Sequence, residues 1–364
     1  MARRALVSGG AGFIGSNLVK FLLAHGVSVC NVDALTYAAN LDSLADLGAG
    51  DYTFVLADIR DRDAMRELLE QFDPDLVFHL AAESHVDRSI EGPAVFVTTN
   101  VLGTFTLLDV ARELWTANGR AVDSRRFVHV STDEVYGSLG DDGLFTETTR
   151  YDPSSPYAAS KAGADHLAHA YFRTYGLPVI VTNCSNNYGP RQFPEKLIPL
   201  MITRALSGEP MPVYGAGNNV RDWLYVDDHC EALWAAAERG TPGRDYNIGG
   251  NQERRNIDVV RAICAEVERA RPARTNEALA GKQYEELITF VDDRPGHDFR
   301  YAIDASRIAR ELSWEPSETF ESGLEKTVRW YLENARWVER ATSGEYRDWI
   351  DKNYAERLEA RDAR

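Results

Sequence analysis

Runs of apolar and β-branched residues alternate with longer segments of helical periodicity in the first half of the chain. The apolar runs predict strands at Ala5–Ser8, Ser28–Asp33, Thr53–Ala57, Leu76–Leu80, Phe127–Ser131 and Val179–Asn183. The helical segments are Ser16–His25, Arg62–Gln71, Val95–Trp115 and Tyr157–Tyr175. Strands that are apolar on both faces and alternate with helices are typical of a parallel sheet covered on both sides. We therefore predict an α/β fold, a doubly wound parallel sheet of the Rossmann type.

The pattern changes after about residue 185, where proline and glycine residues divide the chain into short pieces. We expect a smaller, loop-rich C-terminal substrate lobe at residues 186–340, packed on the carboxyl ends of the predicted sheet. The segments Val226–Ala237 and Tyr246–Ile248 are expected to return to the first lobe, so the NAD-binding domain at 1–185 would include parts of 226–250. Residues 341–364 are rich in charge and are predicted to form a C-terminal tail.

Composition argues against several kinds of partner. The chain has 364 residues, enough for two lobes, and its formal charge of −16 disfavours nucleic-acid binding because phosphates are repelled. We see no apolar run near the roughly 20 residues that cross a bilayer, and the early glycine motif leaves no room for a cleavable signal. The four cysteines are widely spaced, as expected of reduced thiols. We predict a cytoplasmic protein with no membrane or nucleic-acid partner.

A glycine-rich motif, Gly9-Gly-Ala-Gly-Phe-Ile-Gly15, follows the first predicted strand and opens the first helix. Gly9, Gly12 and Gly15 permit a tight turn and let a pyrophosphate approach the helix N-terminus, with Phe13 and Ile14 beside it. Asp33 ends the second strand, where a carboxylate binds ribose hydroxyls and repels a 2′-phosphate. The motif predicts a dinucleotide site that favours NAD over NADP. The alternative is an ordinary helix-start turn with a strand-end cap.

Later strand ends extend the predicted cofactor site. Asp58 and Ile59 close the third predicted strand, where an adenine ring fits. Leu80, Ala81 and Ala82 close the fourth, and small residues there let a dinucleotide lie across the strand ends. Each of these groups alone is equally compatible with ordinary strand-end packing. Their register with the glycine motif favours cofactor binding.

Tyr157 and Lys161 lie four residues apart and therefore on one face of a predicted helix. A phenol with a pKa near 10 is a weak base at neutral pH. A nearby ammonium group and the positive nicotinamide ring would lower that pKa. Tyr157 is thus predicted to accept the proton of a sugar hydroxyl during hydride transfer to NAD. Thr132, at the end of the fifth strand, would share this hydroxyl, with strand-end capping as its alternative role.

Asp133 and Glu134 follow Thr132 directly and indicate a second chemical step. Oxidising C4 of a hexose to a ketone makes the C5 hydrogen acidic and places the C6 hydroxyl β to the carbonyl. A carboxylate then takes the C5 proton, a carboxylic acid protonates the departing C6 oxygen, and hydride returns to C6. Crowding and burial would separate the two titrations. The alternative is a pair of exposed loop acids without a chemical role.

The chain resembles the extended short-chain dehydrogenase/reductase superfamily and, within it, the dTDP-glucose 4,6-dehydratase family, over roughly residues 4 to 335. The matching motifs are Gly9–Gly15, His79–Ile90, Ser131–Gly137, Ser154–Lys161, Asn183–Pro190, Phe193–Pro199, Val220–Tyr225, Asn247–Gly250 and Asp293–Asp298. The implied reaction converts dTDP-glucose to dTDP-4-keto-6-deoxyglucose and water on bound NAD. Tyr157 would be the base at the C4 hydroxyl, supported by Lys161 and Thr132. Asp133 would be the acid at C6 and Glu134 the base at C5.

The resemblance also implies further contacts. Those with the cofactor would include Leu35, Thr36, Ser84, Thr99 and Asn187. Those with the sugar nucleotide would be Ser84, Thr132, Asn186, Lys196, Leu197, Pro212, Tyr214, Arg221, Asn256, Arg294, His297 and Asp298. Arginine suits a diphosphate because it forms bidentate, charge-assisted hydrogen bonds. A homodimer paired through Val95–Trp115 and Tyr157–Tyr175 is expected, and no metal site is predicted.

Other functions remain open on the sequence alone. A UDP-hexose 4-epimerase would share Tyr157 and Lys161 but would not need the acid–base pair at Asp133 and Glu134. A GDP-mannose or UDP-glucose 4,6-dehydratase would keep the mechanism and change the nucleotide sugar. A non-catalytic dinucleotide sensor would not need Thr132, Tyr157 and Lys161 together. Thymidine and uridine differ by one methyl group, which typically supplies only about 1–3 kcal/mol of discrimination.

Overall fold

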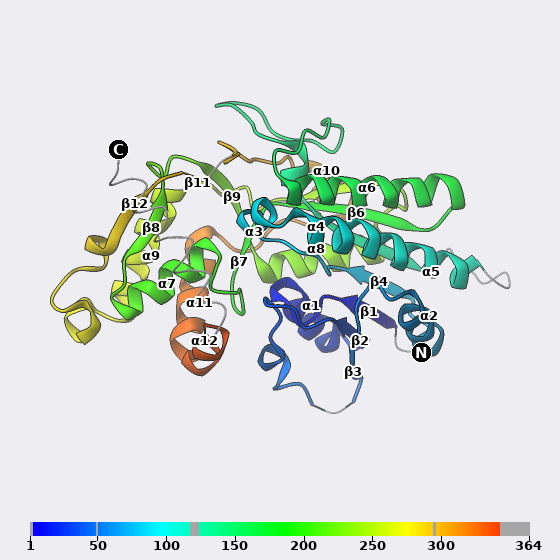
Figure 1. Ribbon diagram of the computed structural model, residues 1–364, viewed down its shortest axis with the longest axis horizontal. Helices are drawn as coiled ribbons and strands as arrows, with labels where there is room; N and C mark the ends of the chain where they lie inside the picture. The colour runs from blue at the N-terminus through cyan, green and yellow to red at the C-terminus, as the bar shows by residue number, and fades with distance from the viewer. Residues whose placement is uncertain (1–2, 49, 117–123, 294–295, 343–364) are drawn as a thin grey trace.

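The computed structural model describes residues 3–48, 50–116, 124–293 and 296–342, which form two lobes (Figure 1). The larger lobe is built on a seven-stranded sheet in the order β10-β6-β5-β4-β1-β2-β3. Its strands are β1 (Arg4–Ser8), β2 (Ser28–Asp33), β3 (Tyr52–Leu56), β4 (Leu76–His79), β5 (Arg126–Thr132), β6 (Val179–Cys184) and β10 (Asp245–Ile248). Every neighbouring pair is parallel, so all carboxyl ends meet at one edge of the sheet.

Helices cover both faces of this sheet. One face packs against α1 (Phe13–Ala24), α8 (Val226–Arg239) and α10 (Ser306–Leu312). The other packs against α2 (Arg62–Phe72), α5 (Thr104–Thr116) and α6 (Pro156–Tyr175). The strands are apolar on both sides because each side meets a helix layer; Ala5, Leu6 and Val7 of β1 are all inaccessible to solvent. The doubly wound α/β fold predicted from the sequence is confirmed.

The expected strands are all present, with bounds that shift by one residue at most. The first helix differs more. It begins at Phe13, three residues before the predicted Ser16, because the glycine motif turns the chain into helical geometry immediately after Gly12. The glycine motif therefore supplies the first turn of α1 as well as the loop before it.

The predicted helix Val95–Trp115 is one continuous helical stretch with an interruption. It comprises α4 (Pro93–Phe96), a π-helical segment η2 (Val97–Gly103) and α5. Within η2, the Asn100 amide accepts a hydrogen bond from the Glu83 N–H (2.8 Å) and donates to the Glu83 carbonyl (2.9 Å) and the Ser160 hydroxyl (2.8 Å). π-Helical turns often occur at functional sites. Here the turn links the segment after β4 with α6.

This stretch, Pro93–Thr116, is the one helix among the described residues that is long and apolar enough to span a membrane, with a mean hydropathy of 1.5. By length and composition alone, this stretch contradicts the sequence-based expectation that no segment approaches the length needed to cross a bilayer. Half of the stretch is buried inside the protein, and a core helix of a globular protein passes the same test. The helix packs against α2 and α6 in the layer that covers the sheet.

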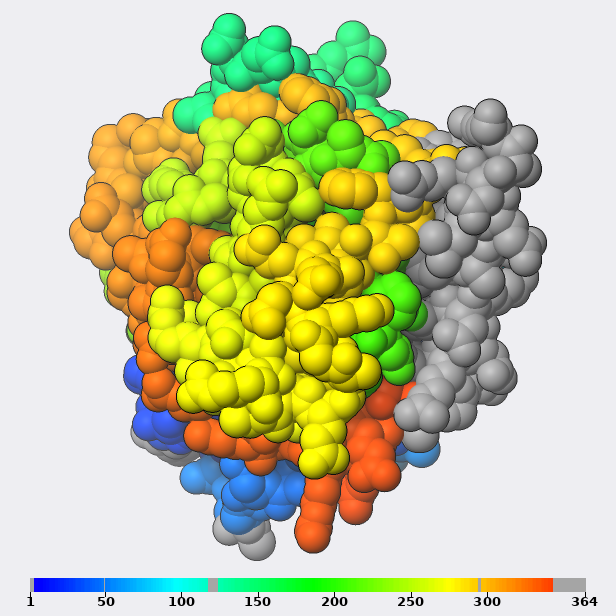
Figure 2. Space-filling model, turned by 90° about the vertical axis from the view of Figure 1, so that its left-hand side faces the viewer, coloured from blue at the N-terminus to red at the C-terminus, as the bar shows by residue number. Residues whose placement is uncertain are grey.

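The smaller lobe contains two short sheets and a helical layer. One sheet has the order β11-β9-β7 and the other pairs β12 with β8. The strands are β7 (Asn186–Tyr188), β8 (Met211–Tyr214), β9 (Val220–Tyr225), β11 (Glu253–Arg255) and β12 (Ile288–Val291). The helices are α7 (Leu197–Ser207), α9 (Asn256–Ala270), α11 (Phe320–Glu333) and α12 (Ala335–Ala341). Figure 2 faces this lobe and shows the chain around α9 and the turns after it, in yellow tones, over the middle of the surface.

Short helices complete the described chain: η1 (Leu41–Leu44), α3 (Val86–Glu91), η5 (Asp133–Tyr136), η6 (Ala273–Thr275), η7 (Glu277–Leu279) and η8 (Tyr284–Leu287). The Trp337 indole of α12 donates to the Ser43 hydroxyl of η1 (3.0 Å) and so joins the two lobes. Because α8 and β10 pack with the larger lobe, we propose that the NAD-binding domain comprises 1–185 and 226–250 and that the rest of 186–340 forms the smaller lobe. Of the charged segment 341–364, only Ala341 and Thr342 fall within the described residues.

Candidate active site

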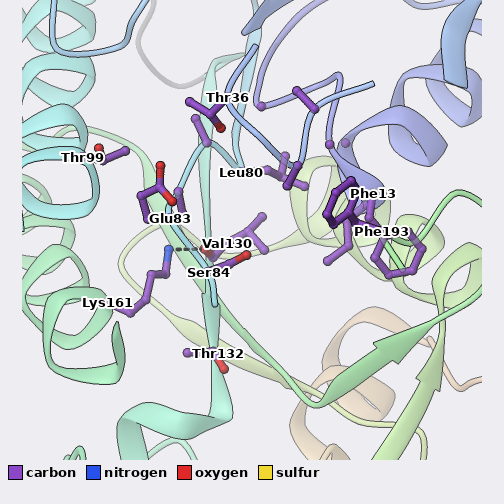
Figure 3. Close-up of a pocket in the computed structure, with 18 of the residues that line it drawn as sticks. Phe13, Thr36, Leu80, Glu83, Ser84, Thr99, Val130, Thr132, Lys161 and Phe193 are labelled. Atoms are coloured by element: carbon purple, nitrogen blue, oxygen red, sulfur yellow. Dashed lines mark hydrogen bonds between the residues drawn. The ribbon is translucent and has the colours of Figure 1, made fainter. Parts of the chain in front are cut away.

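A cavity of about 380 Å³ lies at the carboxyl ends of the sheet strands (Figure 3). Its lining begins at the loop after β1, crosses the ends of β2 and β4, and reaches the end of β5 and the start of α6. In Figure 3, Lys161 and Thr99 lie on one side of the view, and Phe13 and Phe193 on the other. Parallel α/β sheets bind ligands at this edge, outside the carboxyl ends of their strands.

The glycine motif is closely packed and leaves the N-terminus of α1 accessible. A Cβ atom on Gly15 would lie 2.1 Å from the Gly9 carbonyl oxygen, and one on Gly9 would lie 2.7 Å from the Ala81 nitrogen. Gly9 also has a φ of +76°, which side chains rarely tolerate. No side chain caps the N-terminus of α1, so its first N–H groups are available to an anion. The motif has the features of a pyrophosphate cradle.

Asp33 is held by the loops on either side of it. Its Oδ2 accepts a hydrogen bond from the Ala11 N–H (2.9 Å), and its Oδ1 accepts one from the Leu35 N–H (2.8 Å). Burial raises the pKa of Asp33, whereas these two amide bonds oppose that effect. A carboxyl group fixed in this way keeps further lone pairs for ribose hydroxyls. Leu35 itself does not line the cavity; its backbone, with a φ of +51°, orients Asp33.

The other predicted cofactor residues come together in the cavity wall. They are Gly9, Gly12, Phe13, Ile14, Gly15, Thr36, Asp58, Ile59, Leu80, Ala81, Ala82, Ser84, Thr99 and Asn187. Asp58 is fixed by Arg60, whose guanidinium donates to both carboxylate oxygens, and this pairing lowers the pKa of Asp58. The residues present therefore fit a dinucleotide along the full row of strand ends.

The predicted catalytic residues also meet in this cavity. Thr132 ends β5, and Asp133 and Glu134 begin the 3₁₀ turn η5 directly after it. Tyr157 and Lys161 project from the first turns of α6, which Ser155 caps by accepting a hydrogen bond from Ala158. All five residues line the cavity.

Lys161 is almost fully buried, at 5% exposure, and its Nζ donates to the Val130 carbonyl of β5 (2.7 Å; Figure 3). Burial lowers the pKa of Lys161, and the Asp165 carboxylate acts in the opposite direction. The hydrogen bond to β5 fixes the ammonium group beneath the ends of the central strands.

The Tyr157 phenol differs from expectation. Its pKa lies well above the usual range, because burial and the charge of Glu134 both oppose the phenolate, and a hydrogen bond with Thr132 only partly offsets them. The lowering by Lys161 that the sequence suggested is not among the largest influences in the chain alone. A phenol in this environment keeps its proton until a ligand changes the local charge.

The two adjacent acids occupy different environments. Asp133 is 2% exposed, and its Oδ2 is buried without a hydrogen-bond partner. Burial, followed by repulsion from Glu134, raises the pKa of Asp133 well above its ordinary value. Glu134 is only partly buried. The alternative of two exposed loop acids is therefore excluded for Asp133, and the pair has the asymmetry that an acid and a base require.

The predicted substrate residues divide into two groups. Ser84, Thr132, Asn186 and Lys196 line the cavity, and the Lys196 Nζ donates to the Ser84 carbonyl (3.0 Å). A second group lies on the smaller lobe outside the cavity lining: Leu197, Pro212, Tyr214, Arg221, Asn256, His297 and Asp298. Arg294 lies outside the described residues.

This second group nevertheless approaches the catalytic end. Arg221 on β9 donates to the carbonyls of Phe299 (3.2 Å) and Asp298 (2.8 Å), and its guanidinium lies 4.2 Å from the Tyr301 ring centre. The charge of Arg221 lowers the pKa of Asp133, against the larger effect of burial. Tyr214 reaches the larger lobe by donating to Asp87 (3.2 Å). Arg221 therefore acts on the reacting end from the smaller lobe.

Several cavity residues were missed by the sequence reasoning. Glu195 has a side chain that is 1% exposed; its Oε1 accepts from the Tyr37 hydroxyl (3.2 Å) and its Oε2 lies 3.4 Å from the Arg88 Nε. Glu83, Gln192 and Phe193 also line the cavity. The proximity of Glu195 to the predicted Lys196 was the available signal. Among the described residues, no group of three or more His, Cys, Asp or Glu side chains could hold a metal ion.

Known proteins resemble this chain over nearly its full length. A family profile described as GDP-mannose 4,6 dehydratase matches residues 6–327. A dTDP-glucose 4,6-dehydratase of Shigella flexneri is 56% identical over 363 residues, covering 96% of this chain and 99% of that protein. Another, from Escherichia coli strain K12, is 55% identical with the same coverage.

Solved structures agree with this relationship. The dTDP-glucose 4,6-dehydratase of Bacillus anthracis, in complex with NAD, has a TM-score of 0.81 and 45% identity, covering 93% of this chain and 100% of that one. The UDP-glucose 4-epimerase of Thermotoga maritima shares the fold with a TM-score of 0.80 at 28% identity, covering 91% and 99%. The resemblance stated from the motifs is confirmed, and this chain belongs to the dTDP-glucose 4,6-dehydratase family.

Proposed function

We propose that the protein converts dTDP-glucose to dTDP-4-keto-6-deoxyglucose and water. The observation that carries this proposal is the asymmetric acid pair beside Tyr157, in which Asp133 is buried with a raised pKa and Glu134 is partly exposed. An epimerase needs a base at C4 but no acid–base pair for elimination. Relatives that are 54–58% identical and named for this activity support the same reading.

The cofactor is NAD, which fits the cradle of the glycine motif and the fixed Asp33 carboxylate. NAD, when bound, supplies the acceptor of the C4 hydride and the later donor of hydride to C6. Asp33 favours NAD over NADP because its carboxylate would face, and repel, a 2′-phosphate. The dehydratase structures from Bacillus anthracis and Streptomyces venezuelae were solved with NAD, which supports this assignment.

In the first chemical step, Tyr157 removes the proton from the C4 hydroxyl. Thr132 orients that hydroxyl by sharing its hydrogen bond, because both side chains line the same end of the cavity. Lys161 supplies fixed positive charge from below, and this charge supports the phenolate once substrate and cofactor have displaced water. Burial then strengthens each of these interactions.

In the second step, Glu134 takes the C5 proton and Asp133 gives its proton to the C6 oxygen. The C5–H and C6–O bonds break, a C5–C6 double bond forms, and one water leaves. Asp133 suits the acid role because burial raises its pKa, and Glu134, which is only partly buried, is the remaining carboxyl group for the base role. Return of the hydride to C6, together with a proton returned to C5, then completes the 6-deoxy product.

The smaller lobe binds the nucleotide. Arg221, Lys196 and Asn256 are the residues that we assign to the diphosphate and its sugars, and Tyr214, His297 and Asp298 to the surrounding wall. The His297 ring packs edge-on against Tyr214 at 5.9 Å between ring centres, and His297 is also paired with Asp293 (2.6 Å). Leu197 begins α7 and Pro212 lies on β8, and we assign both to the same wall. Arg294 joins these substrate residues because it lies in the motif Asp293–Asp298.

We further propose a homodimer formed through the two long helical stretches. Apolar side chains are exposed on the first of these stretches, at Val97, Leu102 and Phe105. Such a patch is typical of a self-association surface. Leu102→Asp should therefore produce monomers in sedimentation velocity, whereas Leu56→Asp, at a more exposed leucine on β3, should not. Unchanged assembly in Leu102→Asp would rule out this face.

The cell compartment that we propose is the cytoplasm. Its support is the set of four buried free thiols, Cys30, Cys184, Cys230 and Cys264, which fits a reducing environment. No membrane or nucleic-acid partner is part of the proposal.

The direct test is to incubate the purified protein with dTDP-glucose, UDP-glucose and GDP-mannose, and to identify each product by mass spectrometry and NMR. Loss of water from dTDP-glucose without net reduction of NAD is expected. A C4 epimer as the product would replace the dehydratase by an epimerase. In a second arm, deuterium placed on C4 should reappear on the C6 methyl group, and its loss to solvent would refute internal hydride return.

A further inference from the structure

A buried carboxylate projects from the catalytic helix α6 toward β5 and lies outside the cavity lining. Asp165 follows Lys161 by four residues on α6, so the two side chains share one face of the helix. Asp165 is fully buried and Lys161 is 5% exposed. Asp165 is not part of the cavity lining and therefore cannot touch substrate or cofactor there.

Three donors hold this carboxylate in place. Its Oδ1 faces the His129 Nε2 at 3.0 Å, and its Oδ2 accepts from the hydroxyls of Ser131 (2.8 Å) and Tyr151 (3.0 Å). Burial alone would raise the pKa of Asp165, but the bonds from His129 and Ser131 and the charge of Lys161 outweigh it, so the pKa is lowered. Asp165 is therefore an ionised group in a dry environment.

The other titratable groups that face Lys161 are neutral. His79 on β4 and His129 on β5 have lowered pKa values, because burial disfavours their charged forms. Burial raises the pKa of Cys184 on β6 to about 12, so this thiol stays protonated. Within the described part of the chain, Asp165 is thus the charged group that opposes the burial of Lys161.

We propose that Asp165 is a positioning residue that keeps Lys161 protonated beneath the strand ends and so sets the highest pH at which the enzyme works. An ammonium group removed from water is costly unless an opposite charge compensates it. Asp165 supplies such a charge, because it follows Lys161 by four residues on α6 and three hydrogen-bond donors fix its carboxylate. The inference rests on the proposed function, in which the Lys161 ammonium supports Tyr157.

The expected pH effect has a definite sign. Burial lowers the pKa of Lys161 and Asp165 raises it. Without the Asp165 charge, burial acts alone, so Lys161 loses its proton at a lower pH. The alkaline limb of kcat/KM should then move to lower pH, by about one to two units, as is usual when a group loses an opposite charge.

The test compares Asp165→Asn with Tyr151→Phe. Asp165→Asn keeps the shape and one acceptor oxygen but removes the charge. Tyr151→Phe removes one hydrogen bond to the same carboxylate and leaves its charge, and Tyr151 does not line the cavity. We expect the alkaline limb to shift in Asp165→Asn and to stay within about 0.3 units in Tyr151→Phe. Equal limbs in all three proteins, or equal shifts in both variants, would overturn the proposal.

A second readout does not depend on activity. The chain has six lysines, Lys20, Lys161, Lys196, Lys282, Lys326 and Lys352. Labelling lysine with ¹³C at Cε gives few NMR signals, and a Lys161→Met variant assigns the relevant one. Its titration should move to lower pH in Asp165→Asn. A protein without dehydratase activity would refute the proposed function and leave this titration intact as a separate result.

The wild-type protein alone also tests the inference if Asp165→Asn does not fold. With Asp165 in place, the Lys161 signal should remain that of an ammonium group at pH 7 and above. Loss of its proton below pH 7 would overturn the proposal without any variant.

Discussion

The two regions that meet at the cavity are built in different ways. On the larger lobe, the reacting groups come from two short segments, the end of β5 with η5 and the start of α6. The sheet ladder fixes β5, and the hydrogen bond from Lys161 to the Val130 carbonyl ties α6 to it. On the smaller lobe, Arg221, Tyr214 and His297 come from separate elements and are held by bonds between side chains and backbone or between side chains. The first region is rigid and local, and the second is assembled from distant parts.

This difference predicts a division of labour. Groups fixed at sheet ends keep the geometry that a reaction step needs. Groups assembled from several segments provide many contacts to an extended ligand, each of which contributes modestly. Substitutions on the larger lobe should therefore change kcat, whereas those on the smaller lobe should change KM. The following variants test this contrast.

Tyr157→Phe should have the largest effect. Removing the base at C4 is expected to lower kcat by about 10³- to 10⁴-fold, since a positioned acid or base contributes up to this much. Substrate affinity should change little, because the ring and its packing against Phe96 remain. Stopped-flow absorbance of the reduced nicotinamide and calorimetric titration of dTDP-glucose separate the two quantities. A variant that reduces its cofactor at the normal rate would remove Tyr157 from this role.

Glu134→Gln should slow elimination by about 10²-fold. C4 oxidation should continue, because Tyr157, Thr132 and Lys161 are unchanged, so reduced cofactor should accumulate during turnover. Absorbance under single-turnover conditions follows this accumulation. Normal turnover without accumulation would show that another group takes the C5 proton.

Arg221→Met should weaken substrate binding by about tenfold while kcat changes less. The reason is the loss of charge-assisted hydrogen bonds, each worth about 1.5–3 kcal/mol, which rearrangement of the smaller lobe partly offsets. Steady-state kinetics with dTDP-glucose give KM and kcat. Arg221→Lys is the control, since it keeps the charge that acts on Asp133. A fall in kcat with an unchanged KM would contradict the proposed division between lobes.

The smallest expected effect concerns stability: Asp133→Asn should raise the free energy of unfolding. The pKa of Asp133 is raised on folding, so the folded state holds this proton more tightly than the unfolded chain and loses stability as pH rises above the unfolded value of about 3.9. The variant should be more stable than wild type by about 0.5–2 kcal/mol at pH 7. The difference should shrink as pH falls toward 4. Urea unfolding at both pH values measures it, and a less stable variant at pH 7 would contradict the raised pKa.

The same contrast explains what the sequence could predict. The strands, the glycine motif and the pair Tyr157 and Lys161 depend on local periodicity, so they could be placed from spacing alone. The buried state of Asp133 and the raised pKa of Tyr157 could not, because both depend on tertiary packing around η5. Glu195 was missed for the same reason: its burial arises from Tyr37 and Arg88, which lie more than a hundred residues away in the chain.

The apolar pattern of one helix did not predict the irregular segment within it. The helix Val95–Trp115 was predicted from its apolar spacing, but its π-helical segment leaves the apolar pattern nearly unchanged. The signal is Asn100, a polar residue on the buried side, whose amide needs partners in the interior. Leu35 was expected to touch the cofactor, whereas its role here lies in the backbone geometry that orients Asp33.

The π-helical turn has a consequence for how this family can vary. The seven residues of η2 rotate the helix about as far as six α-helical residues would, so deleting one residue here would restore an α-helix and leave α5 nearly in phase with the sheet. The buried stripe that includes Leu107, Leu108 and Ala111 would keep its place, whereas the Asn100 amide would leave Glu83 and Ser160. The extra residue of this turn thus serves the active-site framework and not the core. A single codon lost here would disturb that framework in a protein that still folds, although no residue that touches substrate had changed.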